Sequence, residues 1–300
     1  MAKRKKKEKS PTRPKKHILH KAKVNRSHAG NAVVEIMILI LGAFMALPFV
    51  YAVGSAFKPL NELFLYPPRL LPQNPTFTNF IGLWALMKSS WVPMSRYLFN
   101  TVFVTLVGTL GQIIAASMCA FPLAKHPFPG NKIIFKLIFL SLMFHSSATA
   151  IPTYIIMAKL KLLNTYWALI LPACAGSFGL YLMKQFIEQI NNAILEAAEI
   201  DGASIWQTFI KIVMPMVKPA WLTLTVFSVQ ALWNQGASTF IYSEELKSFS
   251  YAISQIIAGG IARTGTGMAV SVVMMSVPIA VYIITQSSVM QTMASSGVKE

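Results

Sequence analysis

Acidic residues are scarce in this 300-residue chain, which has 10 Asp and Glu against 27 Lys and Arg. Only 12% of its residues are charged and 54% are hydrophobic, with a mean hydropathy of +0.53. Soluble domains carry roughly 25% charged residues, so the composition indicates a membrane protein. Twelve of the basic residues lie within the first 28 positions beside a single acid, Glu8. The high pI is thus a property of a tail, which excludes a globular nucleic-acid-binding domain.

Cysteine and the motifs of several enzyme classes are also missing or rare. The only two cysteines, Cys119 and Cys174, lie inside apolar runs, which is typical of packed thiols and excludes a disulfide scaffold. The chain has neither the G-x4-G-K-[ST] loop that holds nucleotide phosphates nor an HExxH zinc motif. We therefore expect no catalytic residue, no metal site and no cofactor in this chain.

Six stretches without Asp, Glu, Lys or Arg are long enough to cross a bilayer of roughly 30 Å. Because lipid leaves no partner for bare backbone groups, these stretches should be helices. The predicted fold class is all-α integral membrane, with spans at about 33–57, 97–124, 134–158, 162–184, 219–243 and 266–290. A shorter uncharged run, Phe249–Ala262, favours an interfacial or re-entrant segment. No carboxylate lies well inside a span, which weakens the alternative of an ion-coupled secondary transporter.

The basic arm, residues 1–30, sets the predicted orientation, because Lys and Arg near the ends of spans are retained in the cytoplasm. With six spans, both the N- and C-termini are cytoplasmic, and residues 31–300 form the transmembrane domain. Charges after the arm favour neither side. We expect the arm to be disordered and to lie against anionic membrane lipid, with no nucleic-acid partner.

Two connections are long enough to fold. The outer one, Lys58–Arg96, combines six prolines with apolar residues, which predicts a folded lid. The inner one, residues 186–218, reads as two short helices separated at Gly202, with an apolar stripe on the second and Pro215 ending it. Small residues at its bend suit a docking surface for another protein. An amphipathic loop lying on the membrane is the alternative.

The inner connection also resembles a known motif. It reads Glu196, Ala197, Ala198, three residues, Gly202, nine residues, Ile212, one residue, Met214 and Pro215. This resembles the EAA loop of bacterial ABC importer permeases, EAA-x3-G-x9-I-x-LP, with methionine in place of leucine. Further pieces are similar to the carbohydrate-uptake, MalG-like branch: Phe128–Gly130, Leu163–Tyr166, Ile200–Ala203, Trp233–Asn234 and the tail Gln286–Glu300. The chain differs where the branch usually has proline, at Asn191 or Asn192, and where Phe144 and His145 replace a common I-P.

The resemblance implies a type I (MetI-like) ABC importer permease in the bacterial cell membrane. Its expected partners are a second, MalF-like permease, two ABC ATPase subunits that bind ATP and Mg, an extracellular solute-binding protein and a carbohydrate, an oligosaccharide in the similar members. The family's coupling helix carries over to Glu196, Ala197, Ala198, Asp201 and Gly202. Apart from a secondary transporter, the alternative is an ABC importer permease for a solute other than sugar.

Residues for the substrate path are predicted from sugar chemistry, because neutral sugars are recognised by amide and hydroxyl groups and by aromatic rings. Trp233, Asn234 and Gln235 are the best candidates, since three consecutive residues cannot all face lipid. His145 is the only histidine in a predicted span, and an intramembrane histidine is a functional candidate by default. The more common role of such residues is a contact between helices.

Overall fold

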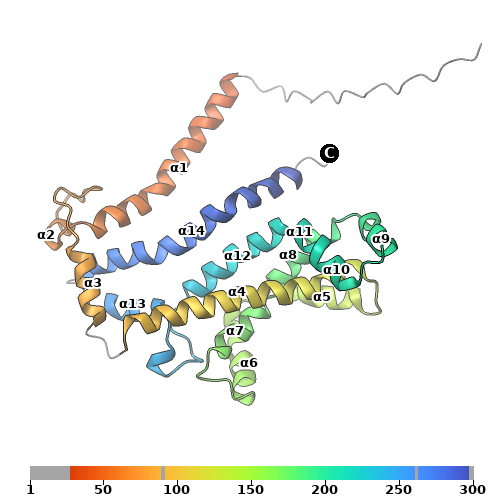
Figure 1. The fold of residues 1–300 in the computed structure, drawn as a ribbon. Coiled ribbons are helices and arrows are strands. Elements are labelled where there is room, and N and C mark those ends of the chain that lie inside the picture. The colour runs from red at the N-terminus through yellow and green to blue at the C-terminus, as the bar shows by residue number, and fades with distance from the viewer. Residues whose placement is uncertain (1–27, 89–91, 261–262, 297–300) are drawn as a thin grey trace, which may run out of the picture. The chain divides into compact units, whose positions relative to one another are not determined.

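The computed structural model describes residues 28–88, 92–260 and 263–296. Every regular element in these ranges is a helix (Figure 1), so the all-α prediction is confirmed for this part of the chain. Residues 1–27 of the predicted basic arm lie outside the described residues. The chain divides into two units, Met1–Pro48 and Phe49–Glu300.

The described part of the first unit belongs to helix α1 (His28–Ala56), which continues past Pro48 into the second unit. The helix is apolar on every side and reaches a mean hydropathy of 2.5 over Gly30–Ala56. These 27 residues measure about 40 Å at 1.5 Å per residue, enough to cross a bilayer. The first predicted span, 33–57, therefore coincides with a helix of suitable length.

Helix α4 (Met94–Lys125) is the central element of the second unit. It packs along α7 (Trp167–Cys174), α8 (Ser177–Glu188) and α12 (Lys218–Trp233), and α12 in turn packs on α14 (Thr264–Ser296) (Figure 1). Small residues allow this close approach: a Cβ added at Gly111 would lie 2.5 Å from the Cys174 sulfur. The predicted span 97–124 is thus a single continuous helix.

Three predicted spans differ from the observed helices. The predicted span 134–158 is broken into α5 (Asn131–Ser141) and α6 (Ser146–Lys159), because His145 adopts an extended conformation and its side chain caps α6 by accepting a hydrogen bond from the Ser147 amide. The fourth span starts at Trp167 and is interrupted at Ala175 and Gly176. The fifth ends at Trp233 instead of residue 243, and the chain continues as a loop, called the outer loop after its predicted side.

Fewer helices of the described chain are long and apolar enough to cross a membrane than the six spans predicted. Among the described residues, α1, α4, the Trp167–Glu188 stretch and α14 can each cross a membrane, and a bent pair, Ile205–Met216 with Lys218–Trp233, gives up to a fifth. The third predicted span is not among them, because it is divided into α5 and α6. The count of six therefore stays a prediction.

The connection 58–96, predicted to lie outside, is folded as predicted in its described residues, 58–88 and 92–96. It contains α2 (Leu60–Leu63) and α3 (Thr78–Lys88). The buried Asn79 amide donates to the carbonyls of Ala56 and Lys58 at 2.9 and 2.7 Å, which fixes the start of α3 against the end of α1. Beyond the 3-10 turn η2 (Glu244–Leu246), the short helix α13 (Phe249–Ile257) packs with Leu83 of α3.

Candidate functional site

The inner loop contains the two short helices that its sequence predicts. The first is α9 (Asn192–Ile200), which Asn191 caps by accepting a hydrogen bond from the Ala193 amide at 3.0 Å. By accepting this bond, the asparagine satisfies one of the backbone amides that have no partner within the helix at its start. The helix ends in a tight turn at Gly202, whose φ of +78° strains any residue with a Cβ.

The five predicted coupling residues all lie on α9 or the turn that follows it. Glu196, Ala197, Asp201 and Gly202 are exposed, whereas Ala198 is 6% exposed and faces the rest of the chain. No neighbouring atom lies within 4 Å of a Cβ built on Gly202. The structure thus brings the five residues together on one short helix and its turn, and another protein can reach four of them.

The second short helix leads from the loop to α12 through a sharp bend. It begins at α10 (Ile205–Thr208) with a capping box between Ser204 and Gln207. A π-helical turn η1 (Phe209–Val213) and α11 (Met214–Met216) follow, and the Met214 amide donates to the Phe209 carbonyl five residues earlier. The segment ends at Met216, one residue after the predicted stop at Pro215, because a proline in the first turn of α11 needs no backbone donor. The segment then meets α12 at 74°.

A cavity of about 420 Å³ lies between the inner loop and the end of α4. Its wall combines charged and apolar side chains, among them Lys125, His126, Glu196, Glu199 and Ile205. The cavity is open and mixed in chemistry, which suits contact with a protein side chain better than enclosure of a small ligand. Among the described residues, no three His, Cys, Asp or Glu side chains are placed to hold a metal ion.

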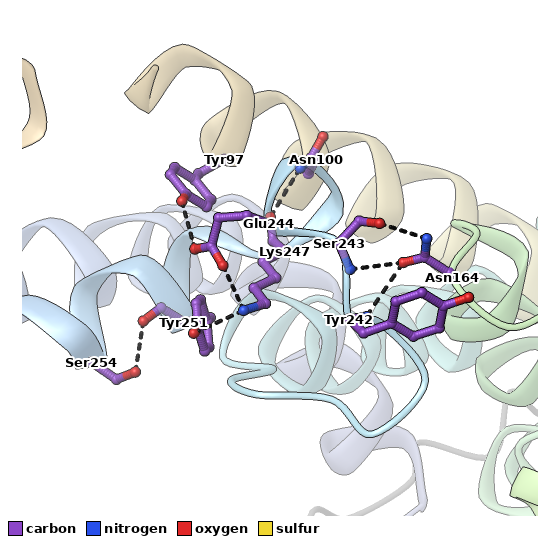
Figure 2. Close-up of polar contacts among 9 residues, drawn as sticks. All are labelled: Tyr97, Asn100, Asn164, Tyr242, Ser243, Glu244, Lys247, Tyr251 and Ser254. Carbon is purple, nitrogen blue, oxygen red and sulfur yellow. Dashed lines mark hydrogen bonds and ion pairs between the residues drawn. The ribbon is translucent and has the colours of Figure 1, made fainter. Parts of the chain in front are cut away.

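The outer loop, residues 234–248, is fastened by side chains from distant parts of the sequence (Figure 2). Asn164, with a φ of +59°, accepts hydrogen bonds from the amides of Tyr242 and Ser243 at 3.3 and 2.9 Å and donates to the Ser243 hydroxyl at 2.6 Å. Asn100 of α4, 1% exposed, donates to the carbonyls of Glu245 and Lys247 at 2.7 and 2.9 Å. The loop therefore has a defined shape.

An ion pair stabilises the same outer loop (Figure 2). The Lys247 ammonium lies 2.6 Å from the Glu244 carboxylate and 2.9 Å from the Tyr251 hydroxyl, while Tyr97 donates to Glu244 at 2.8 Å. Burial raises the pKa of Glu244, but the hydrogen bonds from Lys247 and Tyr97 and the lysine charge outweigh it, so the pKa lies below its ordinary 4.5. Burial lowers the pKa of Lys247, and its bonds to Glu244 and Tyr251 outweigh this effect and raise it.

The predicted substrate-path residues occupy different surroundings. Trp233 is 3% exposed, and its indole donates to the Met274 carbonyl of α14 at 3.0 Å. Asn234 is exposed and bonds back to the Gln230 carbonyl at 2.9 Å. The buried Gln235 amide oxygen has no hydrogen-bond partner within the described chain. His145 is exposed in a different element, at the break between α5 and α6.

Three polar residues that organise the inner and outer loops are not predicted from the sequence. Asn100 and Asn164 were not singled out for the outer loop, nor Lys125 for the inner one. Asparagine inside an apolar run is an available signal for Asn100, since a buried amide needs partners. Its partners are about 145 residues away, and no local pattern indicates them.

The fold and the exposed loop define an integral membrane transport component. Residues 38–293 match the family described as binding-protein-dependent transport system inner membrane component. The chain belongs to this family. The predicted ABC importer permease fold is thereby confirmed, apart from the number of spans.

Individual relatives agree with this assignment. The chain is 31% identical over 239 residues to Protein LplC of Bacillus subtilis, covering 75% of this chain and 74% of the relative. It is 28% identical to the diacetylchitobiose uptake system permease protein NgcG of Streptomyces coelicolor, covering 68% and 66%. The crystal structure of a bacterial ABC transporter that imports the acidic polysaccharide alginate contains a chain of the same fold, with a TM-score of 0.74, 22% identity, and coverage of 87% of this chain and 98% of that one.

Proposed function

We propose that this chain is the transmembrane permease subunit of an ATP-driven importer for carbohydrate, and that α9 couples ATP hydrolysis in partner subunits to sugar passage. The single observation that carries the coupling proposal is the geometry of α9. Four of the five coupling residues are exposed on a capped helix that ends in a left-handed turn, and a bent helix connects that turn to the membrane helix α12.

Carbohydrate as the substrate is supported by the relatives. Their names include transport of polygalacturonan or rhamnogalacturonan in Bacillus subtilis and of diacetylchitobiose in Streptomyces coelicolor. A relative in Escherichia coli, 32% identical, carries sn-glycerol-3-phosphate, which keeps a solute other than sugar as the second candidate. The uncharged amides of Asn234 and Gln235 suit sugar hydroxyls better than a phosphate.

The partners follow from what this chain lacks. Because its sequence has no loop for nucleotide phosphates, ATP and Mg are assigned to two ABC ATPase subunits that receive α9. A second, homologous permease completes the path, and an extracellular binding protein delivers the sugar to the outer loop. In this arrangement both termini and α9 are cytoplasmic, in a bacterial cell membrane.

The coupling role can be tested with an arginine at Gly202. We expect Gly202→Arg to insert normally yet abolish sugar uptake, because a bulky cation at the exposed turn obstructs the approach of the ATPase. Gly130→Arg is the matched control: Gly130 has a φ of +92° and open space around it, so it carries the same backbone strain in another loop. Glu196→Ala should reduce uptake only in part.

The measurements are sugar uptake, ATPase activity and co-purification of the ATPase at equal membrane abundance. Full uptake by Gly202→Arg would refute the coupling role of α9. Equal loss in Gly130→Arg would show that strain in a turn, not contact with the ATPase, causes the defect.

A further inference from the structure

Lys125, the last residue of α4, uses every donor of its ammonium group on one short segment. It donates to the carbonyls of Glu188 and Ile190 at 3.2 and 2.5 Å and to the Asn192 side-chain oxygen at 2.9 Å. These three acceptors lie in the turn that joins α8 to α9. A single cation therefore connects the end of α4 to the beginning of the inner loop's first helix.

The turn supplies acceptors that need a partner. The last carbonyls of a helix have no intrahelical donor, and a cation near a helix C-terminus is stabilised by the helix dipole. Glu188 is the last residue of α8, so its carbonyl meets both conditions. At the start of α9 two asparagines have different partners: Asn191 caps the helix, and the Asn192 side-chain oxygen accepts a hydrogen bond from Lys125.

Helix α9 has few other attachments to the body of the protein. Of its nine residues only Ala198 is buried. Leu195 packs partly buried against the hydrophobic core, and the other attachments are at the two ends: the Gly202 turn leads to α10, and Lys125 binds the turn after α8. Without the lysine, this second attachment is reduced to the packing of the buried Ile190 and to the chain itself.

The other end of α4 is bonded to the outer loop. Asn100 donates to the Glu245 and Lys247 carbonyls, and the Thr101 hydroxyl accepts from the Phe249 amide at 2.8 Å (Figure 2 shows Asn100). The 32 residues of α4 measure about 48 Å, the thickness of a bilayer with its headgroups. The helix thus joins the inner loop to the outer loop without interruption (Figure 1).

We propose that Lys125 is a positioning residue for energy coupling: it fastens the start of α9 to α4, so that displacement of α9 is passed to α4 and the outer loop as well as to α12. This inference rests on the proposed coupling role of α9. The proposal adds a second connection between α9 and the membrane helices, through Lys125 and α4.

The test compares four single variants, and the double variant that combines Lys125→Met with Asn192→Ala, in the reconstituted complex with the second permease, the ATPase subunits and the binding protein. Lys125→Met removes the donors but keeps the length of the side chain, and Lys125→Arg restores donors. Lys132→Met is the matched control, because Lys132 is an exposed lysine on the first turn of α5 with no hydrogen bond in the described structure. Asn192→Ala removes one acceptor only.

The quantity measured is sugar taken up per ATP hydrolysed, which a defect in abundance or folding does not change. Lys125→Met should lower it by about fivefold or more, the low end of typical coupling between sites. Lys125→Arg should recover most of the loss, and Lys132→Met should match the wild type. Asn192→Ala should have a smaller effect that disappears in the Lys125→Met background, because both changes break the same contact.

Three results would overturn the proposal. The first is a wild-type ratio in Lys125→Met, the second an equal loss in Lys132→Met, and the third full additivity of Lys125→Met with Asn192→Ala. If Lys125→Met does not assemble, Asn192→Ala and Lys125→Arg decide the question in its place. Normal uptake by Gly202→Arg would instead remove the coupling role of α9 itself, so the two failures are distinguishable.

Discussion

Asn100→Ala should loosen the outer loop strongly, since this side chain makes two hydrogen bonds to the loop and a third, with Tyr166, that holds the side chain in place. Asn100 donates to the Glu245 and Lys247 carbonyls, and its own oxygen accepts from the Tyr166 hydroxyl at 2.7 Å. Side-chain hydrogen bonds in membrane proteins contribute about 0.6 kcal/mol on average and up to about 1.7. Because Asn100 is 1% exposed, its partners are left unpaired, and we expect a loss of about 2–4 kcal/mol of local stability.

Hydrogen exchange of the loop amides measures this loss directly. The amides of Leu246 and Lys247 donate to carbonyls within the loop, so they exchange only when the loop opens. A change of about 2–4 kcal/mol corresponds to about 30- to 1000-fold faster exchange at these two positions. The experiment uses the protein in lipid nanodiscs, with the amides of α14 as an internal reference.

Two further variants make the estimate refutable. Tyr166→Phe removes one bond of the three and should accelerate exchange by only about fivefold, the equivalent of about 1 kcal/mol. Asn100→Asp keeps the acceptor for Tyr166 but loses both donors, and should resemble Asn100→Ala. If Asn100→Ala exchanged no faster than Tyr166→Phe, the outer loop would not depend on this amide.

Three other outcomes can be measured. Because the pKa of Glu244 is below its ordinary 4.5, its ion pair stabilises the outer loop above pH 4.5, and this stabilisation is lost as the pH falls further. The rate of hydrogen exchange of the loop amides, corrected for its intrinsic pH dependence, should stay constant from neutral pH to about 5 and rise below 4.5. A cysteine at the exposed Tyr242 should react with an impermeant maleimide on intact cells, whereas one at Glu199 should react only after lysis; the reverse pattern would invert the topology. Gly111→Leu should lower the melting temperature by several degrees, since its Cβ collides with the Cys174 sulfur, and an unchanged melting temperature would contradict the observed packing.

Long apolar helices were predictable because hydropathy alone specifies them. The span 97–124 became α4, and the motif from Glu196 to Gly202 gave both the position of α9 and the turn that ends it. In each case the local signal and the tertiary structure agree. Small residues and a glycine in the left-handed region leave few alternatives for such a turn.

The ends of spans were not predictable from the absence of charge. Residues 234–243 contain no charged side chain, yet they form a loop, in which the Asn164 side chain accepts hydrogen bonds from the amides of Tyr242 and Ser243. The third span breaks for a related reason: a local cap at His145 replaces a helical bond. Such contacts depend on which segments meet in space, and the sequence by itself does not pair Asn100 with Glu245.

The π-helical turn at Phe209–Val213 determines how the inner loop responds to the loss of one residue. Its wide turn holds one residue more than an α-helical turn closed at the same place. Deleting one residue there would convert it into an ordinary α-helical turn and leave the segments before and after it in the same orientation, whereas a deletion within a regular α-helix rotates everything before it by about 100° around the helix axis. The five residues Phe209–Val213 should therefore tolerate the loss of one residue far better than the regular helix α9 (Asn192–Ile200).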